Sequence, residues 1–531
     1  MIFSRVIRDS HRDEGSVDIV VSDGVITGIF PAGQVPHGDH VVMDCDDRLV
    51  IPGLWDEHVH FSFWAQHRRR ISLASASSAA EAVAIMAQAV EDNAASQLPA
   101  PIVIGAEYRD GLWPDEKLLH LLDSATGDTP VALASVDVHS GWLNSAALSA
   151  LAVTGHDEQG VIKELAWFEL TQRLGMVSAE TVDSWVLDAA GHAASRGVVG
   201  IVDFEMGYSI PDWVRRAADH DGPYPLQIQA AVYPDDLDRA LEEGMVSGVV
   251  LAPGITVGPF KIITDGSLNS RTAHCVEPYL SVPGEEYGAM NFPPEDIEAM
   301  LTKAHTAGFW LAVHAIGDQA NRVILDIFER HGLSGRIEHA QLVREEDFPR
   351  FAALGIIASV QPEHAIDDRD VTDVYWADRA QRAFALRKLV DSDATLALGS
   401  DAPVSPLDPW IEIAAAVTRT RDGREPWQPE GGLSFDEALR FSTRTTLEVG
   451  QPANIVALDA DPRWLLEAFG SDVPRASDAL RGMTVALTVS AGIVTHTTLA
   501  GEGMTGIEPA PSVWKTEALP LSYIPEGLGA P

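Results

Sequence analysis

The two ends of the chain alternate apolar and polar residues with a period of two, which is typical of β-strands. In SVDIVVSDGVITGIF (16–30) the alternation runs through an Asp-Gly pair, a strong β-hairpin signal. The same alternation returns in PANIVALDADP (452–462) and MTVALTVSAGIVTH (483–496). We therefore predict that residues 1–52 and 447–500 pair with each other into one small β-domain.

The middle of the chain instead alternates short apolar runs with helical patterns. One helical segment begins at a capping signal, in which Ser78 is followed three residues later by Glu81. In PEDIEAMLTKAHTAG (294–308) the apolar residues recur at i, i+3, i+4 and i+7, and Gly308 marks the end. This regular change of pattern predicts strands and helices in alternation.

Eight apolar runs in this middle part predict the strands of a barrel. Near-continuous apolar strands that alternate with helices are typical of a buried parallel sheet, and eight of them indicate a TIM-type (β/α)8 barrel. We expect the barrel within residues 53–446. The predicted strands are GLWDEHVHF (53–61), GIVDFE (200–205), LQIQAAVYP (226–234), PFKIITDG (259–266), WLAVHAIG (310–317), GRIEHA (335–340), GIIASVQP (355–362) and TLALGSD (395–401).

The first and second predicted strands are separated by far more chain than one crossover helix needs. The gap, about 66–178, therefore predicts an insertion with its own structure, and the fold class is α/β with a large insertion after the first barrel strand. After residue 500 a Gly/Pro-rich C-terminal tail (501–531) carries no recognisable motif.

The charge balance narrows the range of partners. Among 531 residues, 37 are basic and 78 acidic, a net charge of −41. Such a surface repels phosphate backbones and anionic lipid, so we expect no nucleic-acid and no membrane partner, but a small-molecule substrate.

Two distant cysteines, Cys45 and Cys275, exclude a disulfide scaffold, and the first residues lack the long apolar segment of a signal peptide. A cytoplasmic protein is expected; a homo-oligomer is compatible with the sequence, which does not decide the oligomeric state.

Polar side chains with metal-binding chemistry stand at the ends of the predicted strands, where barrel enzymes carry their active sites. Residues two apart in a strand share a face, so the two histidines of DEHVH point into one space. An isolated His-x-His is also found as a polar pair near a turn, but four imidazoles and a carboxylate around one rim are ligands for zinc or a similar divalent ion. The candidates are His58, His60, His314, His339 and Asp401, with Lys261 on the fourth strand.

Two of these candidates have a chemical role beyond holding a metal. A catalytic zinc lowers the pKa of a bound water, and Asp401 is placed to take the proton of the attacking water. Lys261 has two interpretations that the sequence leaves open. Carboxylated by carbon dioxide, it becomes an anionic bridge between two ions; unmodified, it contacts the substrate.

Five further residues are candidates for substrate binding. His364, in SVQPEH, ends the seventh strand and faces either the pocket or a loop. His139, Trp142 and Asn144 lie in the insertion and would cover the barrel mouth, although Trp142 is equally expected in an internal core. Arg271 binds a substrate carboxylate or carbonyl, or forms a structural salt bridge.

Several stretches together resemble a known family. The chain is similar to the amidohydrolase superfamily, and within it to the amidohydrolase-3 branch that includes N-substituted formamide deformylases. The motifs recur in the expected order over roughly residues 40–460. They are LVIPGLWDEHVHF, DVHSGWLNSAAL, FKIITDGSLNSRTA, LAVHAIGD, RIEHAQLV, SVQPEH and LALGSDAPV.

The resemblance implies a barrel with a composite β-sandwich from both termini, and metal-dependent hydrolysis of an amide-like C–N bond. It implies one or two divalent ions, with zinc expected, and carbon dioxide as a carbamate on Lys261. The substrate would be an N-substituted amide, a formamide or N-acyl compound. The alternatives are a cyclic amide, a carbamate or a deamination on the same site, or a catalytically idle metal- or ligand-binding protein. By the matching motifs, the ligands are His58, His60, His314 and His339, Lys261 is the bridge, and Asp401 is the base.

Overall fold

The computed structural model describes residues 1–499 apart from 37, 39, 97, 109, 111, 112, 136–139, 164–166, 168, 169, 171–177, 221, 223 and 283. The predicted C-terminal tail, 501–531, lies outside the described residues. The chain divides into two compact units: one combines Met1–His60 with Ala190–Pro531, and the other is Phe61–Ala189. In the described part of the chain, no helix has the length and apolarity needed to cross a membrane.

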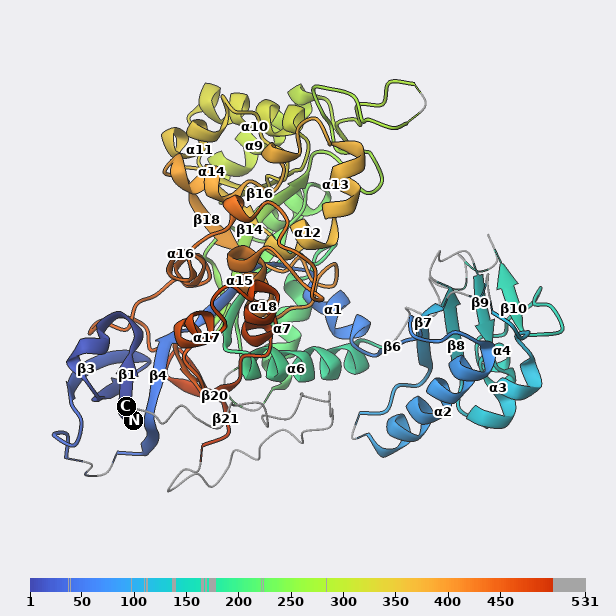
Figure 1. Cartoon of the computed structure of the whole chain (residues 1–531), viewed down its shortest axis with the longest axis horizontal. Helices are drawn as coiled ribbons and strands as arrows, with labels where there is room; N and C mark the ends of the chain where they lie inside the picture. Colours follow the sequence, from blue (N-terminus) through green and yellow to red (C-terminus); the bar gives the residue numbers. More distant parts are fainter. Residues whose placement is uncertain are drawn as a thin grey trace. The chain divides into compact units, whose positions relative to one another are not determined.

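The first unit contains a barrel of eight parallel strands (Figure 1), and each predicted strand is confirmed. The order around the sheet follows the chain, with the short β13 (Val250–Ala252) added antiparallel to β14. The barrel strands are β5 (Leu54–Val59), β11 (Val198–Asp203), β12 (Gln227–Val232), β14 (Ile255–Ile263), β15 (Leu311–Ala315), β16 (Gly335–His339), β17 (Ile357–Val360) and β18 (Thr395–Leu398).

The barrel closes between its first and last strands, at the position of three candidate site residues. Val59 pairs in parallel with Ala402. The Asp401 amide donates to the His58 carbonyl at 2.7 Å, and the His60 amide donates to the Ala402 carbonyl at 2.9 Å. The seam that closes the barrel therefore holds His58, His60 and Asp401 side by side through their own backbones.

Helices connect consecutive barrel strands and follow the last of them, and some of their ends coincide with capping signals in the sequence. The predicted helix at 294–308 is α9 (Pro294–Ala307), which ends at Gly308 with a left-handed φ of 103°. The capping box of α16 is formed by Ser434 and Glu437. The helices of this part are α6 (Ala179–Ser195), α7 (Ile210–Asp219), α8 (Leu237–Glu242), α9, α10 (Asp318–His331), α11 (Phe348–Leu354), α12 (Pro362–Asp367), α13 (Arg369–Tyr375), α14 (Leu386–Asp391), α15 (Pro409–Thr418), α16 (Phe435–Phe441), α17 (Pro462–Phe469) and α18 (Val473–Arg481).

The two chain ends form one composite sheet of seven strands in the order β21-β20-β19-β4-β1-β2-β3. The predicted hairpin turns at Asp23 and Gly24, both with positive φ as a type I′ turn requires. The β-sandwich implied by the resemblance is one continuous sheet, with register irregularities in β1, around one apolar core. Its strands are β1 (Ile2–Arg8), β2 (Val17–Ser22), β3 (Val25–Pro31), β4 (Val42–Pro52), β19 (Ile455–Leu458), β20 (Val485–Ser490) and β21 (Ile493–Thr497).

The second unit is an independent α/β structure inserted after the first barrel strand. Its five-stranded sheet has the order β10-β9-β8-β7-β6 (Figure 1). It packs against α2 (Ala79–Ala95) and α3 (Leu119–Thr126) around one apolar core, and against α4 (Ser145–Ala150) around a second. The Ser78 side chain caps α2 as predicted. The strands are β6 (Arg70–Ser72), β7 (Val103–Tyr108), β8 (Val131–Ser135), β9 (Ser140–Leu143) and β10 (Val161–Lys163); α1 (Phe61–His67) precedes them.

Candidate metal centre

The structure places six predicted site residues of the barrel, together with His364, at the carboxyl ends of strands or directly after them. Parallel strands end at the same rim of a barrel, so their terminal side chains converge on its axis. His58 lies in β5, Lys261 in β14, His314 in β15 and His339 at the end of β16, while His60, His364 (in α12) and Asp401 follow β5, β17 and β18.

Three of these side chains form a compact group of nitrogen and oxygen ligands. The ligand atoms of His58, His60 and Asp401 all lie within 4.8 Å of one another. Asp401 Oδ1 is 3.4 Å from His60 Nε2 and 3.5 Å from His58 Nε2. Two imidazoles and one carboxylate are three protein ligands of the kind that a catalytic zinc uses, with a fourth position open.

A second group shares the same aspartate. His339, His364 and Asp401 also have ligand atoms within 4.8 Å of one another, and His364 Nε2 is 3.8 Å from Asp401 Oδ2. The two oxygens of Asp401 therefore face different histidines. Among the described His, Cys, Asp and Glu residues, these two triads are the groups with ligand spacing.

The protonation states of these residues favour cation binding. Burial, together with the nearby Lys261 ammonium, lowers the pKa of His58 to about 4. Burial and the neighbouring His314 lower the pKa of His339 well below its ordinary value. Burial alone would raise the pKa of Asp401, but His58 and a hydrogen bond with His60 outweigh it and hold the pKa well below the ordinary value. Near pH 7 His58 and His339 therefore offer neutral imidazole lone pairs and Asp401 a carboxylate anion. Burial would lower the pKa of His60, but its hydrogen bond with Asp401 outweighs burial and raises that pKa.

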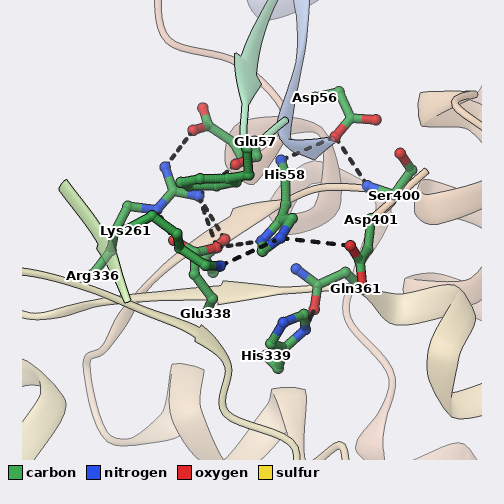
Figure 2. Close-up of polar contacts among 12 residues, drawn as sticks. Asp56, Glu57, His58, Lys261, Arg336, Glu338, His339, Gln361, Ser400 and Asp401 are labelled. Carbon is green, nitrogen blue, oxygen red and sulfur yellow. Dashed lines mark hydrogen bonds and ion pairs between the residues drawn. The ribbon is translucent and has the colours of Figure 1, made fainter. Parts of the chain in front are cut away.

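A buried ionic network orients His58. Its Nδ1 lies 2.7 Å from Glu338 Oε2, so Nδ1–H donates to that carboxylate and Nε2 is left for a cation. Arg336 donates to Glu338 at 2.5 Å and to Glu57 at 2.8 Å, and Arg444 donates to both Glu57 oxygens at 2.6 Å. Figure 2 shows Glu338 on one side of His58 and Asp401 on the other.

Sequence reasoning missed this network, although a signal for it is present. Glu57 and Glu338 each stand directly before a predicted ligand, in DEHVH and RIEHA, and both are buried. A carboxylate inside an apolar strand needs a buried partner. One partner of Glu338, Arg336, stands two residues earlier in RIEHA, but His58 and both arginine partners of Glu57 lie hundreds of residues away and are identified only by the folded structure.

Lys261 reaches the same centre from β14. It is 1% exposed, its Nζ lies 3.5 Å from His58 Nε2, and it stands 4.3 Å above the Phe204 ring. Burial lowers the pKa of Lys261 to about 8, against the opposing effect of Glu338 and Asp401. A substantial fraction of this amine is therefore unprotonated just above neutral pH.

His314 lies beside the two triads and belongs to neither. Its ring is 4.5 Å from that of His339, and its Nε2 is 3.4 Å from Asp265 Oδ1. Asp265 is fully buried and accepts backbone N–H bonds from His274, Ile316 and Gly317 at 2.9 to 3.0 Å. The structure thus brings His314 next to the centre with Nε2 directed at Asp265.

The backbone at two predicted ligands adopts the left-handed conformation that glycine favours. His339 has a φ of 75° and Asp401 a φ of 56°. A non-glycine residue in this region costs about 1–3 kcal/mol and is found mainly at functional sites. The strain supports a functional role for this rim of the barrel.

Gly399, which directly follows β18 and precedes Ser400 and Asp401, leaves space for the His58 backbone. A Cβ at this position would lie 2.5 Å from the His58 backbone nitrogen, which cannot rotate away. We expect Gly399→Ala to destabilise the fold by about 1–3 kcal/mol and to weaken metal binding, because His58 must shift. Urea denaturation and zinc titration measure both effects. The matched control is Gly191→Ala in α6, where a Cβ meets nothing within 4 Å; unchanged metal binding in both variants would contradict the account.

The other predicted substrate-binding residues have mainly structural contacts. His139 lies outside the described residues. Trp142 is fully buried in the core of the second unit. Asn144 caps α4; its side-chain oxygen accepts a hydrogen bond from the Val131 amide, and its side-chain nitrogen donates to the Thr126 hydroxyl and the Thr129 carbonyl. Arg271 pairs with Glu286 at 3.2 Å and with the Tyr375 hydroxyl at 3.3 Å. These contacts favour the packing and salt-bridge alternatives.

Comparison with known proteins agrees with this fold. The sequence profile of the amidohydrolase family matches residues 41–496. Protein LONG AFTER FAR-RED 3 of Arabidopsis thaliana is 29% identical over 436 residues, 76% of this chain and 74% of that protein. The N-substituted formamide deformylase of Arthrobacter pascens is 22% identical over 504 residues, 85% and 91% of the two chains. An uncharacterized metal-dependent hydrolase from Pyrococcus furiosus superposes with a TM-score of 0.72 at 24% identity, over 87% of this chain and 99% of that one. Since the family match spans most of its length, the chain belongs to the amidohydrolase family and is a hydrolase of carbon–nitrogen bonds.

Proposed function

We propose that this protein hydrolyses the C–N bond of an N-substituted amide, a formamide or N-acyl compound, with zinc as its metal. One observation carries the proposal: His58, His60 and Asp401 present their ligand atoms within 4.8 Å at the seam of the barrel. The substrate class is supported by the similarity to a protein named N-substituted formamide deformylase. The strongly acidic chain fits a small-molecule substrate better than a polyanion.

Metal binding and proton transfer are assigned to different side chains of the site. His58 and His60 would hold the ion, with His339, His314 and Lys261 as further ligands in the arrangement proposed from the sequence. When bound, the ion supplies Lewis acidity, which polarises the substrate carbonyl and lowers the pKa of a water. Asp401 is a carboxylate at neutral pH, so it can accept the proton of the attacking water and pass it to the leaving nitrogen.

Lys261 is proposed to carry a carbamate. Carbon dioxide reacts only with an unprotonated amine, and the pKa of Lys261 is lowered to about 8 by burial. Carboxylation exchanges a cation beside the metal ligands for an anion, which removes repulsion toward a bound ion. The alternative is an unmodified lysine that contacts the substrate.

We expect reconstitution of the metal-free protein to depend on bicarbonate. Activity regained with zinc should rise with added bicarbonate, and this dependence should strengthen as pH rises through about 8, because the amine loses its proton there. The measurement is the activity regained after equilibration, against bicarbonate concentration at several pH values. In Lys261→Ala, activity should be low and bicarbonate without effect. Full reactivation without bicarbonate would support the unmodified lysine.

A panel of small molecules tests the proposed reaction. N-alkyl and N-aryl formamides should release formate and the free amine in a zinc-dependent manner, whereas a deaminase substrate would release ammonia. Cyclic amides and carbamates complete the panel. If the zinc-loaded protein hydrolysed none of these compounds, the amide class would be rejected in favour of a binding protein on this scaffold.

A further inference from the structure

The buried ionic network beside His58 extends through the interior of the barrel. Its charged members, from the far end, are Arg444, Glu57, Arg336 and Glu338. Glu57 lies in β5 and Arg336 in β16, which are not neighbours in the sheet, so their contact crosses the barrel. Barrel interiors are usually filled with apolar side chains, and well-packed apolar residues in place of a buried ion pair often give equal or greater stability. Fold stability alone therefore does not account for this network.

Arg444 is the member of the network that reaches solvent. Its side chain is 29% exposed, and those of the other three members are at most 11% exposed. It follows α16 beside the beginning of β5, where the Trp55 amide donates to the Ser442 carbonyl at 2.8 Å. Its guanidinium donates to both carboxylate oxygens of Glu57 at 2.6 Å, and its guanidinium carbon lies 3.7 Å from the centre of the Trp55 ring. Arg444 thus enters the network from the amino ends of the strands, opposite to the rim that carries the metal centre.

Arg336 is shared between two carboxylates. It donates to Glu57 Oε2 at 2.8 Å and to Glu338 Oε1 at 2.5 Å, and Figure 2 shows its guanidinium between the two side chains. With Arg444, two arginines balance two carboxylates. Without Arg444, one guanidinium would have to serve both, and a buried carboxylate that loses a partner is strongly destabilising. Arg336 would then be drawn toward Glu57 and away from Glu338.

We propose that Arg444 is a positioning residue for the metal centre. By pairing with Glu57, it leaves Arg336 to hold Glu338. Glu338 in turn accepts the Nδ1–H of His58 at 2.7 Å and fixes the direction of its Nε2. The inference rests on the proposed function, in which His58 holds the ion.

The place of Arg444 in the chain connects the metal centre to the composite sheet. Arg444 stands between α16, the last helix before β19, and Leu447, which packs in the apolar core of the sheet. A displacement of this segment would move the guanidinium off Glu57. Metal affinity is thereby linked to the junction between the barrel and the composite sheet.

The test measures zinc affinity, by competition with a chelator, in full-length variants that keep every metal ligand. Arg444→Met should bind zinc about 10-fold more weakly and shift the absorption spectrum of the cobalt-substituted protein, because His58 is held less firmly. The double variant Arg444→Met/Glu57→Gln removes one charge of each sign and should regain most of the affinity, because Arg336 then faces a single carboxylate. Wild-type affinity in Arg444→Met, or a double variant that binds no more tightly than the single one, would overturn the proposal.

The matched control is Arg463→Met. The Arg463 side chain is 28% exposed, pairs with Asp9 and Asp436, and lies 4.9 Å from the centre of the Phe435 ring, so it resembles Arg444 in exposure and kind of contact. Its partners are not members of the buried network. Zinc affinity should stay at the wild-type value in Arg463→Met, whatever loss of stability urea denaturation shows. An equal fall of zinc affinity in both variants would show that Arg444 acts through stability alone.

Two further measurements keep the proposal testable if Arg444→Met does not fold. Arg444→Lys keeps the charge but not the forked pair of donors, so its zinc affinity should lie between those of the wild-type protein and the methionine variant. Crystals of metal-free Arg444→Lys give a result that needs no ion. Arg336 should lie closer to Glu57 and farther from Glu338 than in the wild-type protein, and an unchanged network would overturn the proposal.

The outcomes separate this proposal from the proposed function. If Arg444→Met weakens zinc binding in a protein that hydrolyses no amide, the proposed function alone is rejected. If the wild-type protein hydrolyses amides and Arg444→Met keeps the wild-type zinc affinity, the role of Arg444 alone is rejected.

Discussion

Asp401→Asn should lower kcat by about two to four orders of magnitude at saturating zinc, because the amide cannot accept the proton of the attacking water. The backbone should tolerate the change, since asparagine is among the residues that adopt a φ of 56° most readily. Asp401 also belongs to both triads, so zinc affinity should fall as well. Measuring kcat over a zinc titration separates the two effects.

The matched control is Asp393→Asn. Asp393 has a φ of 61°, close to that of Asp401. It is exposed, it precedes β18 in the sequence, and it belongs to neither triad. Its kcat should remain that of the wild-type protein. A wild-type turnover number in Asp401→Asn would show that another group serves as the base.

Glu338→Ala should destabilise the fold by about 3–5 kcal/mol, because it removes one partner of a buried ionic network and leaves the Arg336 guanidinium incompletely paired. Glu338 is fully buried, accepts from Arg336 at 2.5 Å, and receives the Nδ1–H of His58 at 2.7 Å. Urea denaturation measures the loss of stability.

Glu338→Gln keeps an acceptor for His58 but removes the charge, and should weaken zinc binding about 10–100-fold.

The pH dependence of stability gives an independent check on this network. Burial opposes ionisation of Glu338, but Arg336 and His58 outweigh it and hold its pKa well below the ordinary value of 4.5. The stabilisation is therefore present in full above that ordinary value and is lost as pH falls below it. Glu338→Gln should show a weaker loss of stability on acidification than the wild-type protein.

An exposed ion pair is the control for burial. Glu329 is 63% exposed at its side chain and pairs with Arg350 at 2.6 Å, so Glu329→Ala should cost at most about 1 kcal/mol. If Glu338→Ala cost no more than Glu329→Ala, the buried network would not be what holds His58 in place.

The barrel and its rim could be predicted because the signal is local. Each strand is a short apolar run of the right length, and a single polar residue near its end, such as His314 in LAVHA, has no packing reason to be there. Alternation around Asp23 and Gly24 likewise specifies a hairpin without any knowledge of the rest of the fold.

The features that the sequence did not reveal depend on contacts between distant residues. Glu338 and His58 are 280 positions apart, and nothing near either one identifies the other. Trp142 also depends on distant contacts, because the motif DVHSGWLNSAAL does not show whether its indole faces a core or a pocket. The structure buries the side chain completely. The position of His364 relative to Asp401 depends on the turn between β17 and α12, which periodicity does not describe.

The most direct test of the account is zinc binding by the wild-type protein and by a His58→Ala/His60→Ala double variant, measured by equilibrium dialysis alongside formamide hydrolysis. We expect tight binding of at least one zinc per wild-type chain, with removal by chelator abolishing hydrolysis and re-addition restoring it. The folded double variant should lose an ion and the activity. A wild-type protein that binds no divalent ion, or a double variant that keeps its full zinc content and turnover, would contradict it.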